Sequence, residues 1–220
     1  MSLPLYLASR SPRRKELLAQ AGIRFQVHVP QEEELAAPKL RKKGAAKPRQ
    51  KLSSARAIVK QISSAKAHAA VKELRAMGVH SALVLSADTL VFLKNRVLGK
   101  PANIAEAQKT LRALSGKTHE VLTGVTVLAL QNGKLKEHAI QIRTDVEFLN
   151  LKPQWINWYI ETGEPFDKAG AYGCQGYGAA LIRSFRGSYT TVMGLPLEET
   201  LELLEKAGKT TRQSLQQGPA

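Results

Sequence analysis

The pattern of apolar and polar positions is most distinctive between residues 82 and 101. Residues 82–85 form a short apolar run, which is typical of a strand buried on both faces. A second apolar run, at 90–93, follows directly after the four residues S-A-D-T at 86–89. The pattern therefore predicts two buried runs separated by a polar stretch, and it places the carboxylate of Asp88 between them.

The other predicted elements alternate between helices and strands. Helical spacing of apolar residues and flanking cap residues predict helices over residues 12–21, 52–77, 104–114, 154–162 and 195–207. Strands are predicted over residues 5–8 and 25–29, and over 121–130 with a break at its glycine. The Asn132-Gly133 turn predicts a hairpin to a strand over 139–149, and residues 179–185 and 189–193 predict a last hairpin.

Composition limits the class of protein. A chain of 220 residues with 43% hydrophobic and 23% charged residues can build one core or two small lobes that share a sheet. No apolar run approaches the ~20 residues of a membrane span. The first residues lack a basic region followed by a long apolar run, so we expect no signal peptide. The single Cys174 cannot form an internal disulfide, which favours a reducing compartment, and we expect it to serve in packing.

The positive charge is unusual, at +15 with a pI near 10.1, and it predicts affinity for polyanions. Part of it is concentrated in residues 39–60, which hold nine basic residues and no acidic one. Two interpretations stay open for this basic segment: a solvated surface, or an arm that contacts nucleic acid or steers substrate.

An anion site is indicated after the first strand. Ser11 and Pro12 suit the cap and first position of a helix, whose first turn carries Arg13 and Arg14. Free backbone N–H groups, the helix dipole and two guanidinium groups together favour a phosphate there.

The acidic candidates have two interpretations each. Asp88 is either a strand-end residue that caps a neighbouring backbone, or a metal ligand or general base with Lys100 nearby to hold an anion. The run of three glutamates at 32–34 is either a solvated surface or the source of a second ligand for Mg²⁺.

Residues 163–176 hold four glycines together with the Asp167-Lys168 pair and Gln175. Glycine lets the backbone approach a ligand closely, and a glutamine amide both donates and accepts hydrogen bonds, which suits the edge of a nucleobase. A Walker A loop, a dinucleotide fingerprint and paired zinc-type cysteines are absent from the sequence.

Three sequence blocks together resemble the Maf family of nucleoside triphosphate pyrophosphatases. They are L-A-S-R-S-P-R-R-K-E-L-L at 7–18, S-A-D-T at 86–89 with G-K-P at 99–101, and G-E-P-F-D-K-A-G-A-Y-G-C-Q-G at 163–176; G-S-Y-T-T-V-M-G-L-P-L at 187–197 extends the match. The resemblance implies an α/β fold, with an elongated mixed sheet flanked by helices and two lobes around a nucleotide cleft. It also implies one domain over residues 1–207 and leaves 208–220 as a polar tail.

The resemblance assigns roles to residues of this chain. Asp88 matches the catalytic carboxylate, and Glu34, with Glu33 as the alternative, matches a carboxylate that shares a Mg²⁺ or Mn²⁺ ion with it. Arg13, Lys66, Lys100 and Lys168 match cations on the phosphate side. The candidate substrate-binding set is completed by Ser9, Arg14, Thr89, Asp167 and Gln175.

Three positions separate branches of that family, and here they hold Arg13, Thr89 and Gln175, a set that resembles the branch acting on dTTP and UTP. The implied protein is a cytoplasmic hydrolase that clears non-standard nucleotides, with a role in cell-division arrest and a homodimer as further expectations. The alternatives are another base preference, or a nucleic-acid-binding or septum-regulating protein that uses the basic segment. Arg10 departs from the family pattern, where a small or uncharged residue is frequent.

Overall fold

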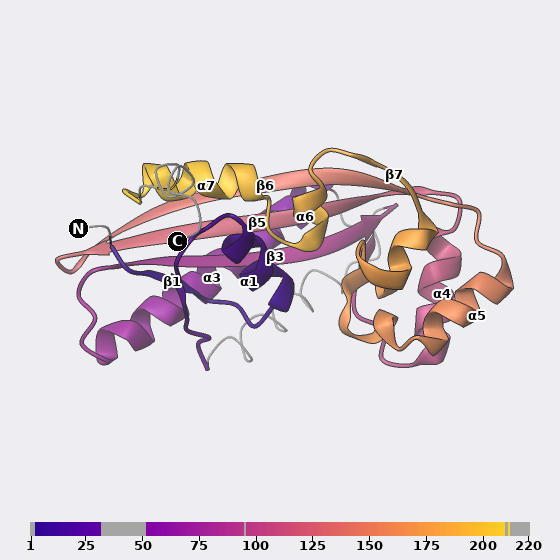
Figure 1. The fold of residues 1–220 in the computed structure, drawn as a ribbon, viewed down its shortest axis with the longest axis horizontal. Coiled ribbons are helices and arrows are strands. Elements are labelled where there is room, and N and C mark those ends of the chain that lie inside the picture. Colours follow the sequence, from indigo (N-terminus) through magenta and orange to yellow (C-terminus); the bar gives the residue numbers. More distant parts are fainter. Residues whose placement is uncertain (1–2, 32–51, 95, 210, 212–220) are drawn as a thin grey trace.

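The computed structural model describes residues 3–31, 52–94, 96–209 and 211. In this part of the chain, seven strands form one mixed sheet in the order β2-β1-β3-β5-β6-β7, with β4 paired to β3 (Figure 1). β1 is parallel to β2 and β3, and the other neighbours are antiparallel. The strands are β1 (Leu5–Leu7), β2 (Gln26–Val27), β3 (Ala82–Leu93), β4 (Arg96–Leu98), β5 (Thr118–Gln131), β6 (Lys134–Phe148) and β7 (Ile182–Arg186).

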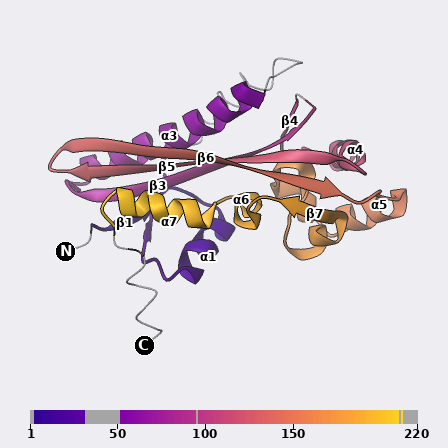
Figure 2. The same cartoon turned by 90° about the horizontal axis from the view of Figure 1, so that it is seen from above.

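Helices cover both faces of this sheet. They are α1 (Pro12–Gln20), α3 (Leu52–Ala76), α4 (Ile104–Leu114), α5 (Pro153–Glu161), α6 (Tyr189–Met193) and α7 (Leu197–Lys206), with three 3-10 helices, η1 (Glu164–Asp167), η2 (Ala169–Ala171) and η3 (Gly176–Leu181). Figure 2 shows α3 on one face and α1 and α7 on the other. The predicted α/β class with an elongated sheet is confirmed. The division into one domain over 1–207 stays a prediction, and most of the tail at 208–220 lies outside the described residues.

The apolar cores explain the two lobes. One core joins α1 and α7 to β1, β3 and β5, and a smaller one lies under α3. A separate core joins α4, α5 and the 3-10 helices to the far ends of β3, β5 and β6. Long strands therefore connect two helical groups, and in Figure 1 α4 and α5 gather at one end of the sheet.

Both apolar runs are buried as predicted, but β3 is one continuous strand of 12 residues, so the interpretation of Asp88 as a strand-end residue was wrong. The polar residues Ser86, Asp88 and Thr89 are part of the ladder and pair with Thr126, Gly124 and Thr123 of β5. Buried polar side chains are tolerated there because partners satisfy them: Ser86 Oγ donates to the carbonyl of Ser63 on α3, at 2.5 Å.

α3 is fixed against the sheet by hydroxyl groups and by a glycine. Ser63 Oγ lies 2.9 Å from Thr126 Oγ1, and both side chains are fully buried. Gly124 of β5 faces the backbone of α3, since a Cβ added at Gly124 would lie 2.7 Å from the carbonyl oxygen of Val59. The glycine that was expected to break β5 instead lets the helix approach the sheet closely.

Three further strand predictions need correction. The strand expected over 179–185 is β7 at Ile182–Arg186, and residues 179–181 belong to η3. The strand expected over 25–29 is only Gln26–Val27, which pairs with Tyr6 and Leu7 of the short β1. The expected strand over 189–193 is the helix α6, which Gly194 ends with a φ of 109°. Its β-branched residues favour a strand, yet the segment buries Thr191 and Met193 against the sheet as one helical turn.

His119 makes the stability of the core around α4 and α5 depend on pH. Its Nε2 lies 2.7 Å from the hydroxyl of Tyr172, and its ring packs edge-on against Phe148. Burial lowers the pKa of His119 from 6.5 to about 4, although the charge of Asp145 opposes that shift. The folded protein therefore binds fewer protons than the unfolded chain between these two pH values, and stability falls as pH decreases through this window.

When the pH is lowered from 7 to 4.5, we expect the free energy of unfolding to decrease by about 2 kcal/mol because of His119. Urea denaturation of the wild type and of His119→Phe at both pH values isolates this contribution from that of the carboxylates. The expected result is a smaller loss of stability in the variant. An identical loss in both proteins contradicts the assignment.

Candidate active site

A cavity of about 730 Å³ lies where the two helical groups meet over β3. Its walls come from the start of α1, from α3, from the middle of β3, from the loop after β4, from η1 to the start of η3, and from the end of α6. Its volume is within the range of small-molecule and cofactor sites. The predicted site residues that line it are Ser9, Arg13, Arg14, Lys66, Asp88, Thr89, Lys100, Asp167, Lys168 and Gln175.

A buried ion pair occupies the sheet side of the cavity. Lys66 Nζ lies 3.0 Å from Asp88 Oδ1, and the two residues are 8% and 1% exposed. Asp88 is held by the ladder of β3, and Lys66 by the contacts that fix α3 one turn earlier at Ser63. A buried carboxylate is costly unless it is paired, so Lys66 stabilises the ionised form of Asp88 at this position.

The two arginines of α1 have different environments. Arg14 is 8% exposed and donates to the carbonyl of Gly194 at 2.8 Å, to Ser9 Oγ at 3.0 Å and to Thr89 Oγ1 at 3.3 Å. It therefore ties α1, β3 and the end of α6 together. Arg13 is half-buried, and its Nε has no hydrogen-bond partner among the described residues. Three N–H groups of Arg14 are thus bonded to protein acceptors, whereas the buried Nε of Arg13 is not.

The hydroxyl of Thr89 has a defined orientation. Thr123 Oγ1 donates its hydrogen to the carbonyl of Thr191, at 2.8 Å, and lies 3.0 Å from Thr89 Oγ1. Because a hydroxyl has one hydrogen, Thr89 must donate to Thr123, while it accepts from Arg14. Thr89 can therefore offer a ligand in the cavity a lone pair and no donor.

Two further lysines line the same cavity. Lys168 Nζ donates to the carbonyl of Glu164 at 2.9 Å and to Asp167 Oδ1 at 2.6 Å, and Lys100 is exposed. Burial alone would raise the pKa of Asp167, but the hydrogen bond and charge of Lys168, together with the charge of Arg13, lower it. The site is thus rich in positive charge, which suits phosphate groups.

Comparison with known proteins agrees with this geometry. A family model described as Maf-like protein matches residues 4–207. The chain belongs to the Maf family. It is 42% identical to a dTTP/UTP pyrophosphatase of Anaeromyxobacter sp. (strain Fw109-5), over 100% of this chain and 97% of that protein. It is 46% identical to the dTTP/UTP pyrophosphatase of Symbiobacterium thermophilum, over 93% and 94%, and 44% identical to that of Burkholderia orbicola, over 92% of each chain.

Several predictions for this Maf protein concern residues outside the described ranges. Glu34 and its alternative Glu33 lie outside the described residues, as does the basic segment up to residue 51. A metal role for Glu34, nucleic-acid binding through residues 39–60 and a homodimer therefore stay predictions. In the ranges 3–31, 52–94 and 96–209, no helix has the length and apolar character needed to cross a membrane.

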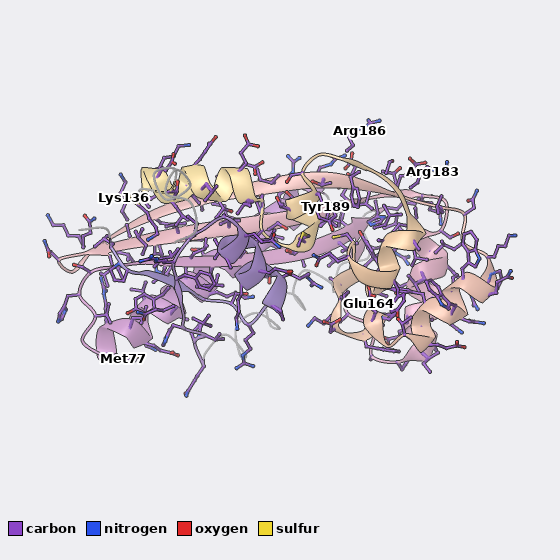
Figure 3. The ribbon with its side chains drawn as sticks, in the orientation of Figure 1. Met77, Lys136, Glu164, Arg183, Arg186 and Tyr189 are labelled. Atoms are coloured by element: carbon purple, nitrogen blue, oxygen red, sulfur yellow. The ribbon has the colours of Figure 1, made fainter. Side chains whose placement is uncertain are left out.

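Glu164 is a residue of the Maf site that sequence reasoning missed. It lines the cavity, and its carboxylate accepts hydrogen bonds from the backbone amides of Tyr177 and Gly178 and from the hydroxyl of Tyr159. Figure 3 shows it on the helical group of α4 and α5. The available signal was its place directly after Gly163 and ahead of the glycines at 170, 173, 176 and 178, where an acidic side chain can accept hydrogen bonds from backbone amides.

The remaining candidates of the Maf chain are structural. Cys174 is 7% exposed within the core under α1, and burial raises the pKa of its thiol, in agreement with a packing role. Among the aromatic residues of α5, Tyr159 is fully buried, whereas Trp155 and Trp158 are 40% and 42% exposed.

Proposed function

We propose that this Maf protein hydrolyses dTTP and UTP to the nucleoside monophosphate and pyrophosphate. The observation that carries the proposal is the buried Lys66–Asp88 pair, which lies in a cavity lined by Arg13, Lys100 and Lys168. The relatives named dTTP/UTP pyrophosphatase, at 42–46% identity over nearly their whole length, support the same substrates.

The chemistry follows from these side chains. A water molecule must attack the α-phosphorus while pyrophosphate leaves, so negative charge builds up on the attacking and leaving oxygens. Asp88 accepts the proton of the water, and Lys66 holds the carboxylate in the ionised form that can accept it. Arg13, Lys100 and Lys168 stabilise the charge on the β- and γ-phosphates.

The residues present fit a divalent cation. Within the described ranges, no group of three or more His, Cys, Asp or Glu side chains could form a complete metal cage. Mg²⁺ in nucleotide enzymes commonly uses one or two carboxylates together with substrate phosphates, and Asp88 can supply one of them. We propose that Asp88, with Glu34, holds Mg²⁺ or Mn²⁺ carried by the substrate, and a bound ion would lower the pKa of water and neutralise phosphate charge.

The hydrogen-bonding groups of Thr89 and Gln175, which line the cavity, are complementary to a pyrimidine base. Uracil and thymine present one N–H donor between two carbonyl oxygens. Thr89 offers an acceptor, because its hydrogen is used by Thr123, and the amide of Gln175 can donate to a carbonyl. This proposal extends to modified pyrimidine triphosphates, which share the same edge, and so to the removal of non-standard nucleotides.

The test is pyrophosphate release from dTTP, UTP, CTP, GTP, 7-methyl-GTP and ITP with Mg²⁺. We expect kcat/KM for dTTP and UTP to exceed that for the other nucleotides by about a hundredfold, because buried polar groups that lose their partner discriminate strongly. Preference for a purine overturns the base assignment, and no turnover of any nucleotide overturns the enzyme proposal.

A further inference from the structure

The loop of residues 173–178, which carries Gln175 into the cavity, is held on both sides by two residues from outside it. On one side, the amide of Gly173 donates to the hydroxyl of Tyr159, at 3.0 Å. On the other side, the amides of Tyr177 and Gly178 donate to the two carboxylate oxygens of Glu164, at 2.9 Å and 3.3 Å.

The two holding residues are also joined to each other. The oxygen of Tyr159 accepts from Gly173, so its one hydrogen is free to donate to Glu164 Oε1, which lies 3.0 Å away. Tyr159 is fully buried, and burial raises the pKa of its hydroxyl, so that this hydrogen stays in place. The bonds therefore form a closed bracket around the loop, with Gln175 between its two sides.

The glycines of the loop show how closely the bracket fits. A Cβ added at Gly173 would lie 2.8 Å from Glu164 Oε1, and one added at Gly176 would lie 2.8 Å from Oε2. A Cβ at Gly178 would lie 2.3 Å from the carbonyl of Gly173 and 2.7 Å from the hydroxyl of Tyr159. The backbone reaches the carboxylate only because these positions carry no side chain.

We propose that Glu164 is a positioning residue that fixes Gln175 against the nucleobase and so contributes to substrate selectivity. This inference rests on the proposed function, because it assumes that Gln175 contacts the base. The side chain of Glu164 is expected to affect binding of the nucleoside and not binding of the phosphates. Lys168, on the phosphate side, contacts the backbone carbonyl of Glu164 and keeps that contact when the side chain is changed.

The variant Glu164→Gln tests this role with almost no change in size. Its amide has one oxygen where the carboxylate has two, so in either orientation an N–H donor faces another donor of the bracket. We expect the loop to lose its fixed position, KM for dTTP and UTP to rise about tenfold and kcat to stay within about twofold, since binding of the base is lost while the reacting atoms are unchanged.

Product inhibition separates the two sides of the cavity. For Glu164→Gln we expect weaker inhibition by dTMP, by about tenfold, and unchanged inhibition by pyrophosphate. Equal weakening of both products, or unchanged KM and dTMP inhibition, overturns the positioning role. Adding Glu164→Gln to Gln175→Ala should raise KM no further than Gln175→Ala alone, because the loop then has no base contact left to position.

Two more variants complete the design. Glu161→Gln makes the same chemical change on an exposed position of α5 and should leave every parameter at the wild-type value. Tyr159→Phe opens the other side of the bracket and should raise KM in the same way, which keeps the test available if Glu164→Gln does not fold. Wild-type protein that lacks dTTP and UTP turnover refutes the proposed function. Normal wild-type turnover with unchanged KM in both bracket variants refutes only the inference about Glu164.

Discussion

Asp88→Asn is expected to lower kcat for dTTP by about a thousandfold, because the amide cannot accept the proton of the attacking water. The substitution keeps the size of a side chain that is 1% exposed, so the ladder of β3 remains. Pyrophosphate release measures the loss, and circular dichroism with thermal denaturation checks that the variant is folded. Activity within tenfold of the wild type would exclude Asp88 as the base.

Asp167→Asn is the matched control for that experiment. Asp167 lines the same cavity and contacts Lys168, but its side chain is 72% exposed. Water can therefore accept the hydrogen bond from Lys168 when the carboxylate is replaced. We expect kcat to fall by less than about tenfold, because exposed ion pairs contribute little. A loss equal to that of Asp88→Asn would move the catalytic base to η1.

Gly124→Ala is expected to lower both stability and activity, although Gly124 lies outside the cavity lining. The added methyl group would lie 2.7 Å from the carbonyl of Val59, so α3 must move away from β5. Overpacking of this kind costs about 2 kcal/mol. Since α3 carries Lys66, its displacement also separates Lys66 from Asp88, which pairs with Gly124 across the ladder.

Urea denaturation and kcat for dTTP together check this prediction. Gly99→Ala serves as the control for stability, since a Cβ there meets nothing within 4 Å, and its unfolding free energy should change by less than about 0.5 kcal/mol. If Gly124→Ala is as stable and as active as the wild type, close contact between α3 and β5 is not required for the site.

Local signals in the sequence predicted the helices well. Asn103 caps α4 through the amide of Glu106, and the helix covers the predicted residues 104–114. The hairpin at Asn132-Gly133 was also correct, because its turn needs only neighbouring residues. The strand expected over 189–193 failed because a strand needs a partner elsewhere in the chain, and no local pattern shows that the partner is missing.

The site could be predicted only as far as local motifs define it. Motif resemblance brought together Asp88, Lys66 and Lys168, which the structure places around one cavity. It did not show that Arg14 is bonded within the protein while the Nε of Arg13 is not, because the bond of Arg14 depends on Gly194, 180 residues away in sequence. The sequence also did not predict the bracket of Tyr159 and Glu164. These side chains accept hydrogen bonds from backbone amides, and no sequence motif specifies where those amides lie.

The continuity of β3 has a consequence for how the molecule can move. Asp88 lies in the interior of a strand and pairs with Gly124 of β5 in a register without breaks, so its backbone can depart from its place only when that ladder opens. The carboxylate therefore keeps its place in the sheet, and a nucleotide that enters the cavity must align with Asp88 where it stands.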